Sequence, residues 1–423
     1  MNFLSLRMFL VRAFVFLGPL GNLLTPHFFP NQFRFYYFLL PLFPIFYTRF
    51  SLKEAKTLLL FFPFLYYSLI SSLYTEFFGI AKEPYPLFRF GLFASQFLFV
   101  LGGALLFRNK ELALHKNNLI RIYLKGFFLS LIVGYLLYIG YYINWFSYSV
   151  INRFSVLSQI GYGFLRFSPG SYPNEYGNLS SFVLSILTLL ILEKKGHFRH
   201  RSFLYLFFIL TFIACFLTTT RAAFLSYIIT LFYLLGISYK FRRTFIRFLV
   251  LSSLLLTTIH FTSIPILSIL MSGIKAMSLG LGSFGVRMEA WSLSLQEFYK
   301  TPLFGSGFAS LSNTHNVYLQ LLFELGVIGS TLLLTTLFLF VSNQMYKLRA
   351  LCFKRHMSEG QIFSNRVIVI GCIHLFWFAL SNHNINHHQT WFVFLLFFMN
   401  LFERVQNKKE SPVGAPKILT DLL

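Results

Sequence analysis

The sequence predicts an all-α protein that crosses a membrane many times. Hydrophobic residues make up 56% of the 423 residues, and charged residues only 12%. Water-soluble domains carry about twice that share of charge, because polar groups must cover much of their surface. The apolar residues also gather in long runs, and a single membrane crossing needs about 20 of them in a helix. These observations favour a polytopic bundle of transmembrane helices.

About twelve segments are apolar enough to be predicted as spans. The run from 203 to 239 is too long for one helix, so its polar break at Thr218–Arg221 is expected to be a tight hairpin. The predicted spans are roughly 8–24, 33–48, 57–74, 88–106, 126–143, 176–192, 203–218, 222–239, 245–262, 314–342, 367–382 and 390–402.

The distribution of positive charge predicts the orientation of these spans. With the spans in place, 27 of the 36 lysines and arginines fall in the loops of one side. Cytoplasmic loops carry such an excess, so this side and both termini are predicted to be cytoplasmic. The net charge of +23 is then mostly a consequence of topology. Because the charges are spread over many short loops, they are weak support for a nucleic-acid partner.

We expect one transmembrane domain over residues 1–405 and a disordered cytoplasmic tail over 406–423, which is polar and contains two prolines. The largest outer loop, about 263–314, is long enough to fold. Its apolar residues are spaced by 4, 3, 4 and 3 positions, which predicts one face of an amphipathic helix along the membrane interface. These residues are Phe284, Met288, Trp291, Leu295 and Phe298.

Two polar residues of this region are candidates for chemistry. Arg287 lies near the start of the amphipathic helix, where an arginine and backbone N–H groups can bind an anion. An arginine that reaches the membrane surface explains the spacing slightly better. His315 follows at the mouth of the apolar segment 314–342. A histidine there is more often a helix cap than a base, but its neighbours Thr314 and Asn316 and the scarcity of acidic residues favour a base.

Two further outer segments carry arginines. The loop from Tyr162 to Gly177 is rich in glycine, proline and aromatic residues, and it contains Arg166 and Asn174. Arg221 stands at the predicted hairpin, in the sequence TTTRAAF. A charge this close to the hydrocarbon usually has a partner or a function. A snorkelling arginine at the membrane interface explains Arg221 about equally well. For Arg166, composition alone does not exclude a covering loop whose arginine meets lipid phosphate.

The last outer loop contains three histidines in the sequence NHNINHHQ. The spacing of His383 and His387 could hold a metal, but no carboxylate lies near them or near His388. A polar rim to a substrate cleft is the favoured interpretation. The only aspartate, Asp421, lies in the tail, and the motifs of nucleotide-sugar and zinc enzymes are missing. We therefore expect neither metal nor cofactor, since arginines can neutralise a diphosphate without a cation.

Three segments between residues 160 and 340 resemble motifs of the superfamily of O-antigen ligases and O-antigen polymerases. Arg166 with the following FSPGSYPN is similar to the family's Arg-x-x-G…P-N segment. TTTRAAF is similar to T-x-S-R, with Thr220 in place of serine. Arg287-x-x-x-Trp291, followed by TPLFGSGF and THNVYLQLLFELGVIG, resembles R-x-x-x-W…P-x-x-G-x-G…H-N-x-x-L…G-x-x-G. The first five spans match only in hydropathy.

The resemblance implies an inverting, metal-independent glycosyltransferase of the bacterial inner membrane. Such an enzyme transfers a glycan from undecaprenyl diphosphate to an acceptor hydroxyl on the periplasmic side. It implies that His315 accepts the proton of the hydroxyl and that Arg221 and Arg287 stabilise the diphosphate. The substrate-binding residues it implies are Arg166, Asn174, Trp291 and Asn316.

Several functions stay open within and beyond this superfamily. A ligase of lipopolysaccharide biosynthesis, with lipid A–core as acceptor, is modestly favoured over an O-antigen or exopolysaccharide polymerase. A transporter of lipid-linked glycans is the alternative from another class. A transporter should show polar or broken helices at mid-membrane, whereas the polar residues here gather at the outer rim.

Overall fold

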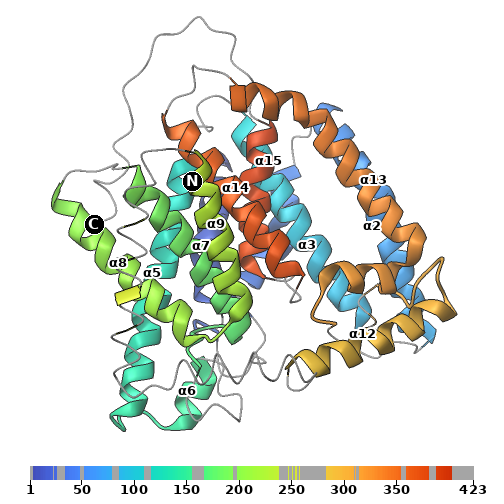
Figure 1. Ribbon diagram of the computed structural model, residues 1–423. Coiled ribbons are helices and arrows are strands. Elements are labelled where there is room, and N and C mark those ends of the chain that lie inside the picture. Colours follow the sequence, from blue (N-terminus) through green and yellow to red (C-terminus); the bar gives the residue numbers. More distant parts are fainter. Residues whose placement is uncertain are drawn as a thin grey trace, which may run out of the picture.

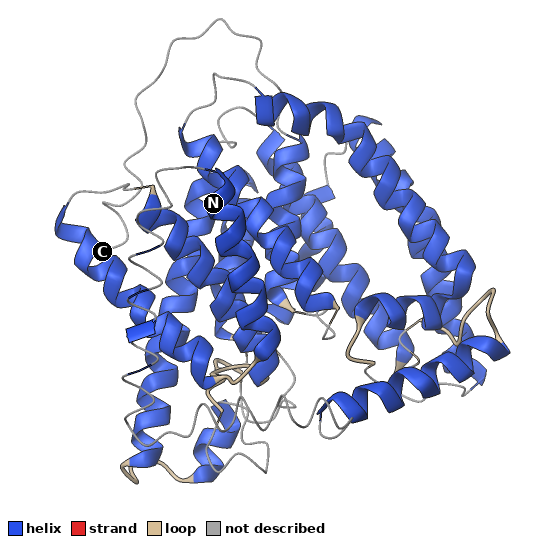
Figure 2. Ribbon diagram, viewed as in Figure 1, coloured by secondary structure: helices blue, strands red, loops and turns tan. Residues whose placement is uncertain are grey.

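The computed structural model describes residues 3–21, 23–25, 34–47, 52–78, 85–108, 116–154, 166–193, 198–237, 246, 250, 253–254, 257, 283–308, 310, 314–353, 359–380 and 387–402. Helices make up nearly all of these residues, and no strand is found among them (Figure 2). The all-α prediction is therefore confirmed for the part of the chain that is described.

The first half of the chain forms the helices drawn in blue to green in Figure 1. They include three 3₁₀ segments, labelled η. Their bounds are α1 Phe3–Leu17, η1 Gly18–Leu20, η2 Phe35–Tyr47, α2 Leu52–Phe78, α3 Pro86–Leu105, η3 Leu106–Arg108, α5 Lys116–Tyr142 and α6 Tyr148–Phe154.

The second half forms the helices drawn in green to red. Their bounds are α7 Pro173–Leu192, α8 Phe198–Leu217, α9 Arg221–Ile237, α12 Ser283–Lys300, α13 Val317–Phe353, α14 Glu359–Ala379 and α15 His388–Phe402. The predicted span at 245–262 and the tail at 406–423 lie outside the described residues, apart from a few isolated positions of the span.

Five of the described helices are long and apolar enough to cross a membrane. They are Pro86–Leu105, Lys116–Tyr142, Pro173–Leu192, Val317–Thr336 and Gly360–Ala379. Three shorter apolar helices accompany them: Phe35–Tyr47, Ser202–Leu217 and Arg221–Ile237. A polytopic membrane architecture is thus supported, while the total of twelve spans stays a prediction.

Helix α7 forms the centre of the bundle and is buried along nearly its whole length. It packs against α8, α9 and α14 (Figure 1). The predicted hairpin is confirmed, because α8 ends at Leu217 and α9 begins at Arg221. Both arms of the hairpin contact α7 more extensively than they contact each other.

One predicted span takes a different local structure. The segment expected at 33–48 forms the 3₁₀ helix η2. Pro41 and Pro44 lie inside it and cannot donate backbone hydrogen bonds, so a regular α-helical ladder is not available there. The tighter helix rises about 2 Å per residue, which lets thirteen residues cover a length that an α-helix needs about seventeen to cover.

Candidate functional site

The predicted site residues gather at one end of the bundle, where α7, α9 and α13 begin. Helix α12 lies across this end (Figure 1). Side-chain contacts tie these segments together. The residues from three motifs far apart in the sequence therefore form one connected region.

Arg166 is buried and holds the turn between α8 and α9. Its Nε donates a hydrogen bond of 2.7 Å to the carbonyl of Thr218. Its Nη2 donates to Asn174 Oδ1 and to Thr220 Oγ1, each at 3.2 Å. Thr219, within the turn, takes a left-handed conformation with φ of 53°. Arg166 and Asn174 thus fix the backbone immediately before Arg221.

Arg221 and Arg287 face the same region from different helices. Arg221 is the first residue of α9 and is exposed, while Arg287 lies one turn into α12 and is half-buried. The pKa of Arg287 is lowered, first by burial and then by the positive charge of Arg221 nearby. Two guanidinium groups that repel each other in this way are favourably placed to share a multiply charged anion.

Trp291 brings α12 into contact with the segment that carries His315. Its indole Nε1 donates a 2.7 Å hydrogen bond to the carbonyl of Thr314. Arg287 precedes Trp291 by four positions, so both lie on the same face of α12. The bond therefore brings the Arg287 side of the helix next to His315.

His315 lies in a strained turn that ends where α13 begins. Its φ of 56° is in the left-handed region, which is uncommon for residues other than glycine. Asn316 then caps the helix by accepting a 3.1 Å hydrogen bond from the backbone N–H of Leu319. The Asn316 amide also donates to the carbonyl of Leu380 at 3.2 Å, which ties the start of α13 to the end of α14. Asn316 therefore has a structural task in addition to the predicted contact with substrate.

Helix α13 is broken at Gly326, and the loop before it closes the break. Gly326 has φ of 65° and ψ of −170°. The carbonyls of Phe323 and Glu324 accept hydrogen bonds from Ser306 and Gly307 of the loop, at 2.9 and 2.8 Å. On the other side of the break, Val327 and Ile328 donate to the loop carbonyls of Pro302 and Leu303, at 2.9 and 3.1 Å. The P-x-x-G-x-G and G-x-x-G motifs are thus two halves of one backbone contact.

An aromatic residue outside the three motifs also contacts the break. Tyr67 of α2 donates hydrogen bonds to the carbonyls of Phe304 and Leu325, at 3.0 and 2.9 Å. Nothing in the sequence around Tyr67 distinguishes it from the many other aromatic residues of the predicted spans. Its contacts depend on the packing of α2 against α13, which are far apart in the sequence.

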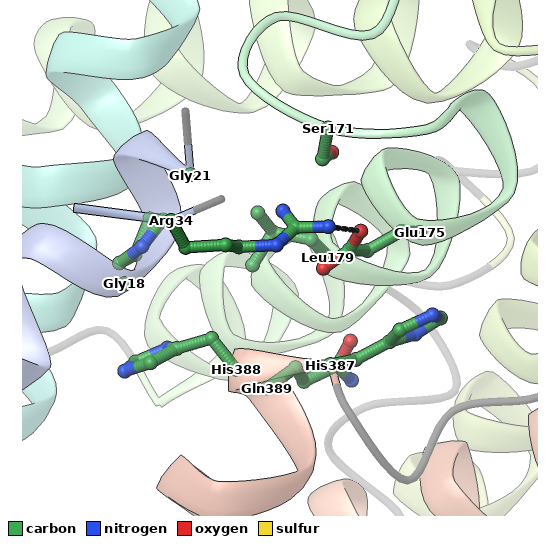
Figure 3. A pocket seen from close by; sticks show the side chains of 10 residues that line it. Gly18, Gly21, Arg34, Ser171, Glu175, Leu179, His387, His388 and Gln389 are labelled. Atoms are coloured by element: carbon green, nitrogen blue, oxygen red, sulfur yellow. Dashed lines mark hydrogen bonds and ion pairs between the residues drawn. The ribbon is translucent and has the colours of Figure 1, made fainter. Parts of the chain in front are cut away.

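A second polar cluster lies on the other side of α7 and was not predicted. Arg34 forms a buried ion pair with Glu175, and its Nη1 also donates to the carbonyl of Gly170 at 3.4 Å. Figure 3 shows Ser171 on one side of Arg34 and residues 387–389 on the other. Together these residues line a small cavity. The available signal was Glu175 itself, an acidic residue at the start of an apolar segment.

The structure separates the predicted histidines. His387 and His388 line the cavity beside Arg34, while His315 belongs to the region around α12. The ring of His388 packs among aromatic residues, with Phe14 at a centroid distance of 4.6 Å and Tyr36 at 4.9 Å. His383 lies outside the described residues, so its pairing with His387 is not tested.

A comparison with protein families bears on the identity of this site. A family model described as O-antigen ligase matches residues 206–334, a segment that contains Arg221, Arg287, Trp291 and His315. Arg166 precedes the matched segment. None of the curated proteins compared with the chain matches it. The family match supports membership of the superfamily of O-antigen ligases and polymerases, as the motifs predicted.

Proposed function

We propose that this protein is a membrane glycosyltransferase that transfers a glycan from undecaprenyl diphosphate to an acceptor hydroxyl. The favoured reaction is that of an O-antigen ligase, with lipid A–core as the acceptor. A polymerase, which would use another lipid-linked glycan as acceptor, is the alternative within the superfamily. The observation that carries the proposal is the proximity of Arg221 and Arg287 beside the turn that holds His315.

The proposed reaction is a single displacement with inversion at the anomeric carbon. The acceptor oxygen forms a bond to this carbon while its proton passes to the imidazole of His315. The bond from the same carbon to the diphosphate oxygen breaks, and undecaprenyl diphosphate leaves with the electron pair. Arg221 and Arg287 would stabilise the charge that develops on the leaving group.

The surrounding residues would support this chemistry by holding the three groups in place. Arg166 and Asn174 fix the turn before Arg221, and Trp291 joins α12 to the residue before His315. A displacement of about 1 Å at a reacting group can lower a rate by about 10²-fold. We therefore assign Arg166 and Asn174 a positioning role beside the predicted role in binding.

The break in α13 is a feature that the transporter alternative would expect. The contacts at the break nevertheless favour an enzyme. Transporters use unwound backbone at mid-membrane to line a cavity or coordinate a substrate. Here the backbone groups on both sides of Gly326 are hydrogen-bonded to the loop at 302–307. The break is therefore filled by the protein's own chain.

The product formed by purified protein tests the proposed function. The protein would be incubated with an undecaprenyl-diphosphate-linked glycan, with or without lipid A–core, and the products separated by size. A ligase attaches glycan to lipid A–core, whereas a polymerase lengthens the lipid-linked chains without it.

Variants of the proposed site provide the control for this assay. General-base catalysis contributes about 10²–10⁴-fold, so His315→Ala should abolish detectable transfer while the protein is still produced. Arg287→Lys keeps the charge but loses the planar fork that fits a phosphate, and it should be strongly impaired. Transfer at a near-normal rate by His315→Ala would refute the assignment of the base.

A further inference from the structure

We infer that the cavity beside Arg34 is a binding site for one neutral hydroxyl-bearing group. The cavity is lined by residues from η1, the segment before α7, α7 itself and the start of α15. Ser171 and Gln389 are among its polar side chains that are more than nine-tenths buried, with 6% and 3% exposure. Neither Ser171 Oγ nor either polar atom of the Gln389 amide has a hydrogen-bond partner among the described residues.

The unpaired atoms specify the chemistry of the occupant. The Gln389 amide offers a donor and an acceptor, and a hydroxyl such as Ser171 can act as either. Nδ1 of His387 is also buried without a partner. A group that both donates and accepts hydrogen bonds, such as a hydroxyl, can pair up to three of these four atoms. Each buried polar atom left unpaired would otherwise cost a substantial part of its hydration free energy.

The charges in the cavity argue against an anion or a cation. Arg34 and Glu175 form an ion pair with each other, so the cluster adds no net charge. Among the described residues, no cluster of three or more histidine, cysteine or acidic residues could hold a metal ion. An uncharged occupant is thus the one that this surface matches.

The size of the cavity limits the occupant to a small group. Its volume is close to the lower limit for one water molecule. Gly18 contributes to the lining without a side chain, and a β-carbon at this position would lie 1.9 Å from the ring of His388. The site therefore accepts a single hydroxyl, either of water or of a sugar whose remaining atoms lie outside.

The cavity lies close to the proposed diphosphate site, so a sugar hydroxyl in it could belong to the glycan substrate. This part of the inference rests on the proposed function. Consecutive side chains of α7 point about 100° apart. Asn174 contacts Arg166 and Thr220 on the arginine side, while Glu175 contacts Arg34 on the cavity side. One helix thus separates the cavity from the proposed diphosphate site.

The sign of a change in thermal stability tests the inference without any assay of transfer. Gln389→Leu removes the polar atoms and keeps a similar volume. If a hydroxyl-bearing group occupies the site, the variant loses its hydrogen bonds, and the melting temperature in detergent should fall by about 2 °C or more. If the site is dry, the same variant removes unpaired buried atoms, and the melting temperature should rise, which would overturn the inference.

Two further variants keep this test decisive. Ser171→Ala is a smaller change that should lower the melting temperature in the same direction if Gln389→Leu does not fold. Gln296→Leu is the matched control, because Gln296 is exposed on α12 and its replacement should leave the melting temperature nearly unchanged. A rise with Ser171→Ala would also overturn the inference.

The source of the hydroxyl is then distinguished by adding a neutral sugar. Glucose stabilises proteins in general, so the measured quantity is the difference between its effects on wild type and on Gln389→Leu. A larger stabilisation of the wild type indicates a sugar hydroxyl in the site, and equal stabilisation indicates water. Both results support a hydroxyl site, and they do not depend on whether the protein transfers glycans.

Discussion

At the scale of single residues, the hydrogen bonds of Arg166 point to a positioning role beside its predicted role in binding. Three hydrogen bonds from its guanidinium reach Thr218, Asn174 and Thr220, and its side chain is buried. Such bonds to a charged donor are individually worth about 1.5–3 kcal/mol. They hold the turn whose next residue is Arg221. The effect of Arg166 on the reaction is therefore expected to pass through the position of Arg221.

Arg166→Lys should lower the turnover number of glycan transfer by at least about tenfold, with a smaller change in KM. Lysine keeps the charge but cannot direct several planar N–H groups at fixed partners. A loss confined to turnover indicates a misplaced catalytic group, whereas a loss of donor binding alone would raise KM. Steady-state kinetics with the lipid-linked glycan would measure both. Arg12→Lys, at an exposed position of α1, is the matched control.

The residues of the site could be predicted from sequence to different degrees. Arg221, Arg287 and His315 stand in motifs whose order resembles a known superfamily, and the structure brings their segments together. Such spacing does not specify the direction of a side chain, so it does not predict the hydrogen bonds of Arg166 to the turn before Arg221. The pair of Arg34 and Glu175 was missed because its members lie 141 positions apart in the chain.

At the scale of elements, α13 is shaped by its contact with the preceding loop. The sequence predicts one continuous span at 314–342, because hydropathy is uniform across Gly326. The structure shows a break there, with φ and ψ that only glycine adopts readily. The backbone partners of the break lie about 20 residues earlier, and Tyr67 lies in another helix. A local pattern carries no information about such partners, so helices were predictable while their interruption was not.

Gly326→Ala should destabilise the protein strongly. A β-carbon at this position would lie 2.4 Å from the carbonyl oxygen of Leu303, and the positive φ adds a further penalty of about 1–3 kcal/mol. The expected result is a lower melting temperature and reduced transfer, because the loop at 302–307 would be displaced. Intrinsic fluorescence during a thermal ramp would measure the first effect.

Gly91→Ala is the matched control for this variant. Gly91 lies inside α3, and a β-carbon there would meet nothing within 4 Å. Replacement of a helical glycine by alanine should be neutral or stabilise by about 0.4–1 kcal/mol. Equal melting temperatures for the two variants would show that the break at Gly326 does not need glycine.

At the scale of the whole molecule, the predicted alternation of loops agrees with two contacts at one end of the bundle. Glu193 and Arg366, from two loops predicted to share the inner side, form an ion pair of 2.7 Å. Lys116 and Asn400, also near predicted inner ends, form a hydrogen bond of 3.2 Å. Both contacts agree with the predicted alternation, while the directions of the individual spans stay a prediction. Charge counting adds which end faces the cytoplasm, and this part stays a prediction.

The scarcity of acidic residues in the whole chain leads to a prediction about metals. Only 13 of the 423 residues are acidic, and the single aspartate is in the tail. If the arginines neutralise the diphosphate, EDTA should leave the rate of transfer unchanged. Loss of transfer that Mg²⁺ or Mn²⁺ restores would contradict the arginine-based account. It would also direct attention to the loop of His383 and His387.

The asymmetry of positive charge leads to a prediction about the side on which the site lies. Labelling of single cysteines would be done in a variant without the native Cys215, Cys352 and Cys372. Lys300→Cys, on the exposed side of α12, should react with an impermeant maleimide in intact spheroplasts. A cysteine in place of Ser358 should react only after the membrane is permeabilised.

The same two positions also separate the possible explanations of a negative result. If both cysteines react only after permeabilisation, Lys300 is inaccessible for a reason other than orientation, and Asn386→Cys in the predicted outer histidine loop becomes the second outer probe. If Ser358→Cys alone reacts in intact spheroplasts, the orientation is reversed. A site that faced the cytoplasm would have to use a glycan that has not yet crossed the membrane. The proposed transfer to lipid A–core on the periplasmic side would then be wrong, even with every contact around His315 unchanged.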